Sequence, residues 1–229
     1  MKYRKLNVAA LVLNLSVLII TAYSVAHNFR QDVIRVPESV NGGTLSDFTG
    51  IYSFRYFTNL SNAFVAIASA ITLFCNVKNV IKDEYSFPRW VVALKYAAVC
   101  AVALTFFTVA LFLSPLITHY GKSYFTLFRG NGFFFHFLIP FLSVLCFVAF
   151  EKSPALPFQS TFTAMLPAIA YSFLYTIMVA GVKLWPDFYS FTHNERYWAL
   201  PITITAMFVL SYGVAALTFF LRKKVNLIK

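Results

Sequence analysis

Charged residues are scarce in this chain: they make up 12% of its 229 residues, and only eight are acidic. A soluble domain carries about 25% charged residues. Hydrophobic residues make up 59% of the chain and include 27 phenylalanines. A water-soluble fold of this size would leave much of that apolar surface exposed. The composition therefore excludes an ordinary soluble domain and predicts a polytopic membrane protein.

Cysteine and glycine are also scarce, with three cysteines and eight glycines. An odd, small number of cysteines does not indicate a disulfide framework, and the absence of a glycine repeat excludes a collagen-like chain. The chain is too apolar to be disordered. Cys75, Cys100 and Cys146 lie in apolar runs or at their ends, so we expect them to pack as small hydrophobic residues and not to bind a metal.

The few charges are mainly basic: 19 lysines and arginines against eight acidic residues give a net charge of +11. In a soluble protein this excess would favour a nucleic-acid partner. Here the basic residues cluster beside apolar runs, where they usually set the orientation of membrane spans. We therefore expect no nucleic-acid partner. No phosphate-binding loop or nucleotide fingerprint is present, so no cofactor is expected either.

Six apolar runs are long enough to cross a bilayer as helices, which takes about 20 mainly apolar residues. They are too long and too continuously apolar to be the alternating strands of a barrel. We predict an all-α protein with six transmembrane helices in a single integral membrane domain over residues 1–229. The predicted spans are Leu6–Ala26, Phe54–Cys75, Trp90–Ile117, Asn131–Phe150, Ser160–Gly181 and Tyr197–Leu221.

The distribution of lysine and arginine predicts the orientation of these spans. The N-terminus, the second and fourth loops and the C-terminal tail share one side and carry eleven basic residues, against six in the opposite loops. Both termini are therefore predicted to be cytoplasmic. The first span also has a signal-peptide alternative, because Ser24-Val25-Ala26 is a small-x-small cleavage pattern, although its apolar run is longer than usual. Lys95 is expected to extend its amine to the cytoplasmic surface.

The second span begins with an unusual density of polar residues. Thr58, Ser61 and Asn62 share one helical face, and Arg55 precedes them by one turn on the same side. Polar groups inside a membrane are costly and often functional, although small polar residues also join helices through hydrogen bonds. We interpret this density as a polar pocket.

The fourth span contains His136, the one histidine within a predicted span. Pro140 has no N–H to donate to the His136 carbonyl, so the helix should loosen beside the imidazole. Thr58 and His136 each lie a few residues from the outer end of their spans, about 6–8 Å deep at 1.5 Å per residue. The predicted topology thus places a hydroxyl and an imidazole in one layer of the non-cytoplasmic half.

A hydroxyl beside an imidazole is the minimal nucleophile–base pair, and neutral histidine can take the proton of a threonine near physiological pH. No aspartate or glutamate lies within a predicted span, so a carboxylate that orients His136 must come from a loop. Asp187 is on the predicted outer side, and Asp47 is a weaker candidate. Candidate donors to an oxyanion are Asn59, Ser61 and Asn62.

A non-enzymatic function is the alternative: the same polar face could serve a transporter, or bind a lipid or another small ligand. A continuous polar path across the membrane would favour transport. Arg55 would then anchor an anion. The candidate substrate-binding residues are Arg55, Asn131 and Trp185.

The segment Tyr56-Phe57-Thr58-Asn59-Leu60-Ser61-Asn62, together with His136, resembles the androgen-induced-gene and androgen-dependent TFPI-regulating protein family and its uncharacterised bacterial relatives. In that family an aromatic-Phe-Thr segment opens the second helix, and a later helix carries a single histidine. The bacterial relatives also tend to show His-x-x-x-Pro, here His136 to Pro140. They carry an aromatic-Pro segment in the last outer loop, here Trp185-Pro186-Asp187.

The resemblance implies a membrane threonine hydrolase that cleaves fatty acid esters of hydroxy fatty acids, with Thr58 as nucleophile and His136 as its partner. Its specific motifs cover some fifteen residues, and the segment ending in Glu151 departs from the Asp-Trp pair of many bacterial relatives. The resemblance is therefore closer to the uncharacterised branch. It implies lipid-ester hydrolysis or acyl transfer in a prokaryotic plasma membrane, with a fatty-acyl ester as substrate and membrane lipids as surroundings; no protein partner is indicated.

Overall fold

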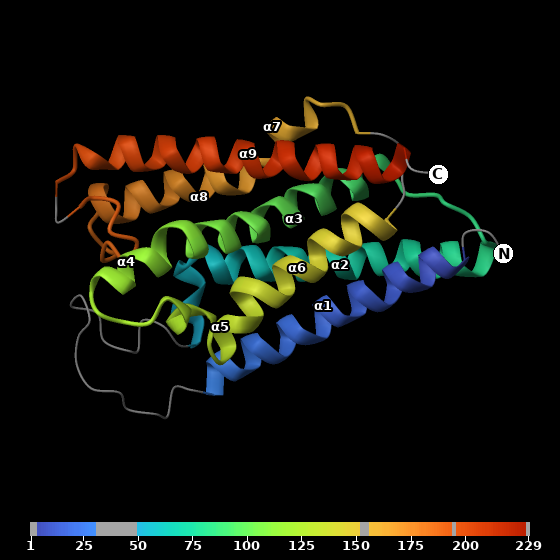
Figure 1. Cartoon of the computed structure of the whole chain (residues 1–229), viewed down its shortest axis with the longest axis horizontal. Helices are drawn as coiled ribbons and strands as arrows, with labels where there is room; N and C mark the ends of the chain where they lie inside the picture. The colour runs from blue at the N-terminus through green and yellow to red at the C-terminus, as the bar shows by residue number, and fades with distance from the viewer. Residues whose placement is uncertain (1–3, 31–49, 152–155, 194–195, 228–229) are drawn as a thin grey trace.

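The computed structural model describes residues 4–30, 50–151, 156–193 and 196–227, which form helices joined by loops. No strand occurs among these residues, so the predicted all-helical class is confirmed. The long helices run side by side in one bundle (Figure 1). Asp47, the weaker of the two candidate carboxylates, lies outside the described residues.

Nine α-helical stretches, several of them joined end to end by π-helical turns, make up the described bundle. The α-helices are α1 (Arg4–Arg30), α2 (Phe57–Lys82), α3 (Arg89–Thr108), α4 (Ser114–His119), α5 (Asn131–Phe133), α6 (Ile139–Leu145), α7 (Ser160–Ala164), α8 (Leu166–Thr176) and α9 (Ala199–Leu227). The π-helical turns are η4 (Val109–Leu113), η6 (Phe134–Leu138), η7 (Cys146–Phe150) and η8 (Ile177–Gly181), and the 3-10 helices are η3 (Gly50–Arg55) and η5 (Tyr124–Phe128).

Five of these helical stretches are long and apolar enough to cross a membrane, which is compatible with an integral membrane protein. They are Arg4–Asn28, Phe57–Lys82, Arg89–His119, Asn131–Phe150 and Ala199–Val225.

The predicted span Ser160–Gly181 differs from the other five, because the structure divides it at Met165 into α7 and the stretch formed by α8 and η8. Pro167 lies in the first turn of α8, where its missing N–H and fixed backbone angle suit the start of a new helix. The apolar stretch Leu166–Gly181 is consequently shorter than the other five.

The helix that carries His136 is loosened, as its sequence predicts. Residues Phe134–Leu138 form the π-helical turn η6, and Pro140 opens α6 directly afterwards. Because proline cannot donate to the carbonyl four residues earlier, the regular hydrogen-bond ladder cannot continue through this point. Short π-helical turns within α-helices are frequent at functional sites.

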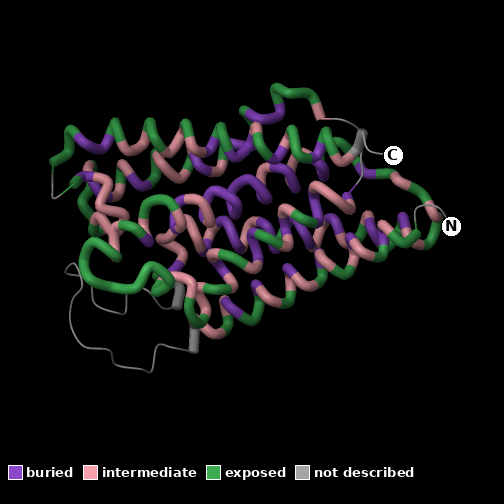
Figure 2. Tube along the Cα trace, in the orientation of Figure 1, coloured by how far each residue is buried: buried purple, intermediate pink, exposed green. Residues whose placement is uncertain are grey.

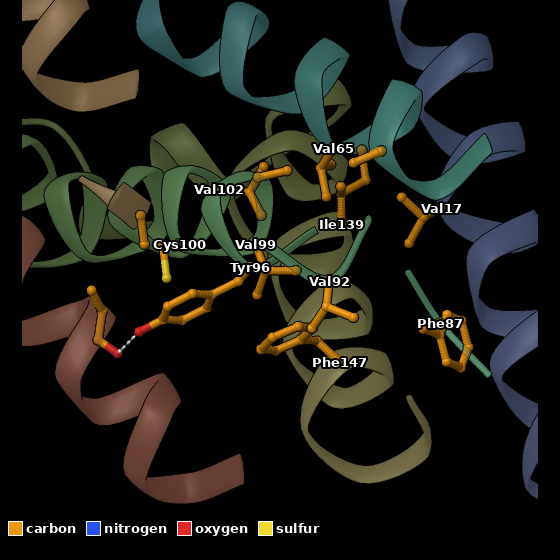
Figure 3. Packing of buried hydrophobic residues seen from close by; sticks show 14 of the residues in the cluster. Val17, Val65, Phe87, Val92, Tyr96, Val99, Cys100, Val102, Ile139 and Phe147 are labelled. Atoms are coloured by element: carbon orange, nitrogen blue, oxygen red, sulfur yellow. Dashed lines mark hydrogen bonds between the residues drawn. The ribbon is translucent and has the colours of Figure 1, made fainter. Parts of the chain in front are cut away.

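The most deeply buried helix is α3, which lies in the middle of the bundle (Figures 1 and 2). Val99 and Val102 of α3 meet Val17 of α1, Val65 of α2 and Ile139 of α6 in one buried apolar cluster (Figure 3). Alanines elsewhere on α3 allow its neighbours to approach closely, as small residues do between membrane helices. The apolar cluster therefore joins α3 to α1, α2 and α6.

Lys95 is buried in the bundle and does not extend its amine to a surface, so the prediction that it does is wrong. Its side chain is 1% exposed, and its Nζ donates to Asn14 Oδ1 at 2.5 Å and to Ser69 Oγ at 2.6 Å. Glu151 Oε1 lies 3.8 Å from Nζ and also accepts a hydrogen bond from Asn14 Nδ2 at 2.7 Å. These polar partners on neighbouring elements make burial less costly than an isolated buried charge would be. We call Asn14, Ser69, Lys95 and Glu151 the inner polar cluster.

Candidate functional site

The N-terminus of α2, which carries Thr58, is held by a residue from a distant loop. Tyr56 precedes the helix in an extended conformation and provides no side-chain cap. Instead, the Phe57 N–H donates to the Tyr189 hydroxyl at 3.0 Å. The first N–H groups of any α-helix lack partners within the helix. The loop between η8 and α9 thus satisfies one of them and fixes the turn in which Thr58 lies.

Thr58 lies on the wall of a narrow cavity of about 40 Å³ between α2, α3, η4, α8, α9 and the loop that carries Tyr189. Its walls are mainly aromatic and aliphatic, with a few hydroxyl groups. The lining residues are Phe57, Thr58, Leu104, Thr105, Thr108, Val109, Leu113, Ala168, Tyr171, Ser172, Tyr189, Phe191 and Met207. We call this the Thr58 cavity.

A wider groove lies beside it, between α8 with η8 and the first half of α9. Its volume is about 480 Å³, and Ser172 lines both the groove and the Thr58 cavity. The other groove residues are mostly apolar and include Phe173, Leu200 and Phe208. The Thr58 cavity and the wider groove therefore adjoin each other at Ser172 of α8.

The polar residues that follow Thr58 on α2 are engaged in the bundle interior. Ser61 Oγ lies 3.0 Å from the Thr58 carbonyl oxygen and 2.9 Å from Thr105 Oγ1. Asn62 Nδ2 donates to the Thr58 carbonyl at 2.7 Å and to the Phe135 carbonyl at 3.3 Å. Both side chains thus position the backbone of Thr58, and Asn62 links it to the residue that precedes His136.

Asn59, also predicted as an oxyanion donor, is buried, and its Nδ2 donates to the Ser53 carbonyl at 2.5 Å. One of its amide hydrogens therefore ties α2 to the preceding 3-10 helix. Asn62 Oδ1, by contrast, is buried and has no hydrogen-bond partner among the residues that the structure describes.

His136 is half-buried at the start of the fourth helical stretch. Its Nδ1 lies 2.6 Å from the Leu127 carbonyl oxygen, which can only accept, so Nδ1 carries the hydrogen and Nε2 keeps its lone pair. The ring packs edge-on against Phe128, with 6.2 Å between ring centroids. His136 does not line the Thr58 cavity, and no hydrogen bond joins its side chain to that of Thr58.

Asp187 has a full set of partners within its own region. Its Oδ1 accepts from the Tyr175 hydroxyl and from the Phe191 N–H, the latter at 2.9 Å. Its Oδ2 accepts from the N–H and the hydroxyl of Thr192, both at 2.6 Å. The structure therefore places this carboxylate at the centre of the loop that carries Tyr189, without a hydrogen bond to His136.

We expect Asp187→Asn to lower the thermal stability of the protein in detergent without acting through His136. Asparagine keeps one acceptor oxygen but loses the charge, and hydrogen bonds to a charged group contribute about 1.5–3 kcal/mol each. A melting experiment on the purified variant measures the loss. Unchanged melting combined with lost ester turnover would instead assign Asp187 the orienting role predicted from the sequence.

The predicted substrate-binding residues lie apart from the Thr58 cavity wall. The Arg55 guanidinium lies over the Tyr52 ring at 4.8 Å. Asn131 Nδ2 donates to the Ser24 carbonyl at 2.9 Å and to Asn28 Oδ1 at 2.6 Å, which ties α5 to α1. Trp185 packs on Phe188 in the cluster around Tyr175. Substrate binding by these three residues stays a prediction.

Within the described ranges, no three histidine, cysteine, aspartate or glutamate side chains are grouped to hold a metal ion. Comparison with protein-family models, curated proteins and solved structures finds no match for this chain. The apolar helices support a transmembrane protein, and the resemblance drawn from the Thr58 and His136 motifs stays a prediction.

Two tyrosines at this site were not predicted from the sequence. Tyr189 and Tyr171 line the Thr58 cavity together with Thr105 and Thr108. Tyr171 also donates its hydroxyl hydrogen to the Arg55 carbonyl at 2.7 Å. Aromatic residues cluster directly after Trp185-Pro186-Asp187, which could have indicated that this loop packs on the bundle. Nothing in the local sequence indicates which helix the loop covers.

Proposed function

We propose that the protein is an intramembrane hydrolase or acyltransferase of lipid esters, with Thr58 as nucleophile and His136 as base. The chain would cross a prokaryotic plasma membrane six times, with α7, α8 and η8 as the fifth crossing and the site in the non-cytoplasmic half. The arrangement of the chain ends supports an even number of crossings, because α1 begins and α9 ends at the same end of the bundle (Figure 1).

The observation that carries this proposal is the position of Thr58 on the wall of a narrow, mainly apolar cavity. Ligand sites typically combine apolar walls with a few placed polar groups. An ester group and its first carbons match the Thr58 cavity, and the remaining acyl chain would continue past Ser172 into the wider groove. The substrate class is therefore a fatty-acyl ester, without a metal or organic cofactor in the chemistry.

The chemistry follows from the hydrogen bonds of the two residues. Leu127 holds the hydrogen of His136 on Nδ1, so Nε2 is the nitrogen that can take the Thr58 proton. Asn62 bonds the backbone of Thr58 and of Phe135, which keeps the two elements in register. Catalytic hydrogen bonds are often long or absent before substrate binds and form in the complex. The η6 turn beside Pro140 is the point at which the imidazole can adjust.

Transport is less well supported by the packing. Val17, Val65 and Ile139 are completely buried and belong to one apolar cluster. Each of these three residues lies, along its helical stretch, between polar residues in the proposed outer half and a residue of the inner polar cluster. A polar solute that crossed the bundle would have to lose its hydrogen bonds to water in this apolar layer. The packing therefore favours a site that acts on one side of the membrane.

Treatment of the purified protein with a fluorophosphonate probe tests the proposal. We expect one adduct by intact mass, located on Thr58 by peptide mapping, because only an activated hydroxyl attacks such a probe. Thr58→Ala should remove the adduct. Thr108→Ala is the matched control, since it removes a hydroxyl from the same cavity and should leave labelling unchanged.

A fluorophosphonate with a long alkyl chain matches the wider groove and serves as the long-chain probe. A parent protein that stays folded and unlabelled by both a short-chain and a long-chain probe would count against an activated Thr58. Equal labelling of the parent and Thr58→Ala would assign the nucleophile to another residue.

A further inference from the structure

Tyr189, from the loop between η8 and α9, contacts the start of α2 next to Thr58. Its hydroxyl accepts the Phe57 N–H at 3.0 Å, although the two residues are 132 positions apart in the chain. Tyr189 and Thr58 line the same cavity. The phenol oxygen of Tyr189 therefore bonds the residue that precedes the proposed nucleophile, at a cavity that both residues line.

The orientation of Tyr189 is fixed on several sides. Its N–H donates to the Tyr175 hydroxyl at 3.3 Å, and that hydroxyl donates to Asp187. Its ring packs against Phe188, with 4.8 Å between centroids, and against Phe191, with 5.3 Å. A group held in this way needs little reorganisation during a reaction, which is the condition for effective electrostatic stabilisation.

Tyr189 is a hydrogen-bond donor at neutral pH. Burial raises the pKa of Tyr189 to about 12, with the hydrogen bond from the Phe57 N–H opposing part of the increase. The phenol therefore keeps its hydrogen across the physiological range. Because its oxygen already accepts from the Phe57 N–H, this hydrogen is the part of the group that can be donated at the cavity.

We propose that Tyr189 is a catalytic residue that donates its hydroxyl hydrogen bond to the carbonyl oxygen of the ester as Thr58 attacks it. This role rests on the proposed function, because it requires Thr58 to be the nucleophile. It replaces the amides of Asn59 and Asn62 as the principal side-chain donor, since those amides bond backbone carbonyls in the bundle.

A bond forms between Thr58 Oγ1 and the ester carbon, the Oγ1 proton passes to His136 Nε2, and the carbonyl π pair becomes a lone pair on the oxyanion, which accepts from Tyr189. When the carbonyl re-forms, the bond to the leaving alkoxide breaks, and the alkoxide takes the proton from His136. Water then attacks the acyl-Thr58 in the same manner and releases a carboxylic acid and free Thr58. Tyr189 keeps its proton throughout.

Two measurements on Tyr189→Phe test the role: turnover of a p-nitrophenyl acyl ester, and binding of the matching alkyl ether, which lacks the carbonyl oxygen. Removal of one oxyanion donor lowers kcat by about 10²–10³-fold. We expect that loss, with the ether Kd unchanged. Tyr212→Phe is the matched control, because it removes a phenol hydroxyl from α9 that lies outside the Thr58 cavity and should keep kcat within a few-fold of the parent.

The outcomes separate the two proposals. Parent-like kcat in Tyr189→Phe, with labelling of Thr58 intact, would overturn the role of Tyr189 alone. An equal loss of turnover and of ether binding would mean that Tyr189 only shapes the cavity and caps α2. That result would likewise overturn the catalytic role of Tyr189. A parent protein that hydrolyses no ester and carries no Thr58 adduct would overturn the proposed function and the role of Tyr189 together.

Discussion

His136→Ala is expected to lower ester turnover by about 10²–10⁴-fold, the contribution that a positioned general base makes. The reason is geometric: Leu127 fixes the Nδ1 hydrogen, so Nε2 is the basic nitrogen that alanine removes. Without it, Thr58 must lose its proton to water. The measurement is steady-state hydrolysis of a p-nitrophenyl ester by the variant in detergent micelles or vesicles, with fluorophosphonate labelling in parallel.

His119→Ala is the matched control, since His119 is an exposed imidazole at the end of α4 and should have no effect. Added imidazole should restore part of the turnover of His136→Ala, because the cavity left by the ring can admit the free base. Turnover within threefold of the parent would contradict a base at this position. A melting temperature far below that of the parent would instead assign His136 to packing against Phe128.

Glu151→Ala is expected to destabilise the protein by about 3–5 kcal/mol, because it leaves a buried ammonium without its counter-charge. Lys95 and Glu151 are 1% and 5% exposed, so water cannot replace the lost carboxylate without opening the bundle. The substitution also removes the acceptor of Asn14 Nδ2. For a chain of this length the loss corresponds to a melting temperature lower by roughly 10 °C.

The double variant Lys95→Met/Glu151→Ala tests the cause. Methionine removes the unpaired charge and fills most of the volume, so the double variant should be more stable than Glu151→Ala alone. Thermal unfolding followed by far-UV circular dichroism measures the parent, Glu151→Ala, Lys95→Met and the double variant. A double variant whose destabilisation equals the sum of the two single ones would show that Lys95 and Glu151 are not energetically coupled.

The membrane helices were predictable because they depend on local composition. A bilayer requires long apolar runs, and those runs are visible in the sequence whichever neighbours each helix has. The loosening before Pro140 follows from the same kind of local signal, whereas α2 begins at Phe57, three residues after the predicted start at Phe54. The break at Met165 is less evident, because apolar residues continue on both sides of Pro167 and the run still has the length of a span.

The location of Lys95 could not be predicted, because its partners come from other elements. Asn14 lies 81 residues earlier in the chain, and Ser69 lies 26 residues earlier. Near the end of a span, the usual expectation for a lysine is that its long side chain extends to the surface. Only the packing of α1, α2 and the segment ending in Glu151 around α3 makes a buried position less costly.

The composition and motifs of the sequence by themselves determined an all-helical chain with membrane-length helices, and they selected Thr58 and His136 as candidates. The tertiary structure decided what each candidate touches: Thr58 lines a cavity with Tyr189, and His136 bonds Leu127. The physical reason is the range of the interactions. Apolar length and proline act within one helix, whereas the hydrogen bond between Phe57 and Tyr189 exists only after the loop before α9 has folded onto the start of α2.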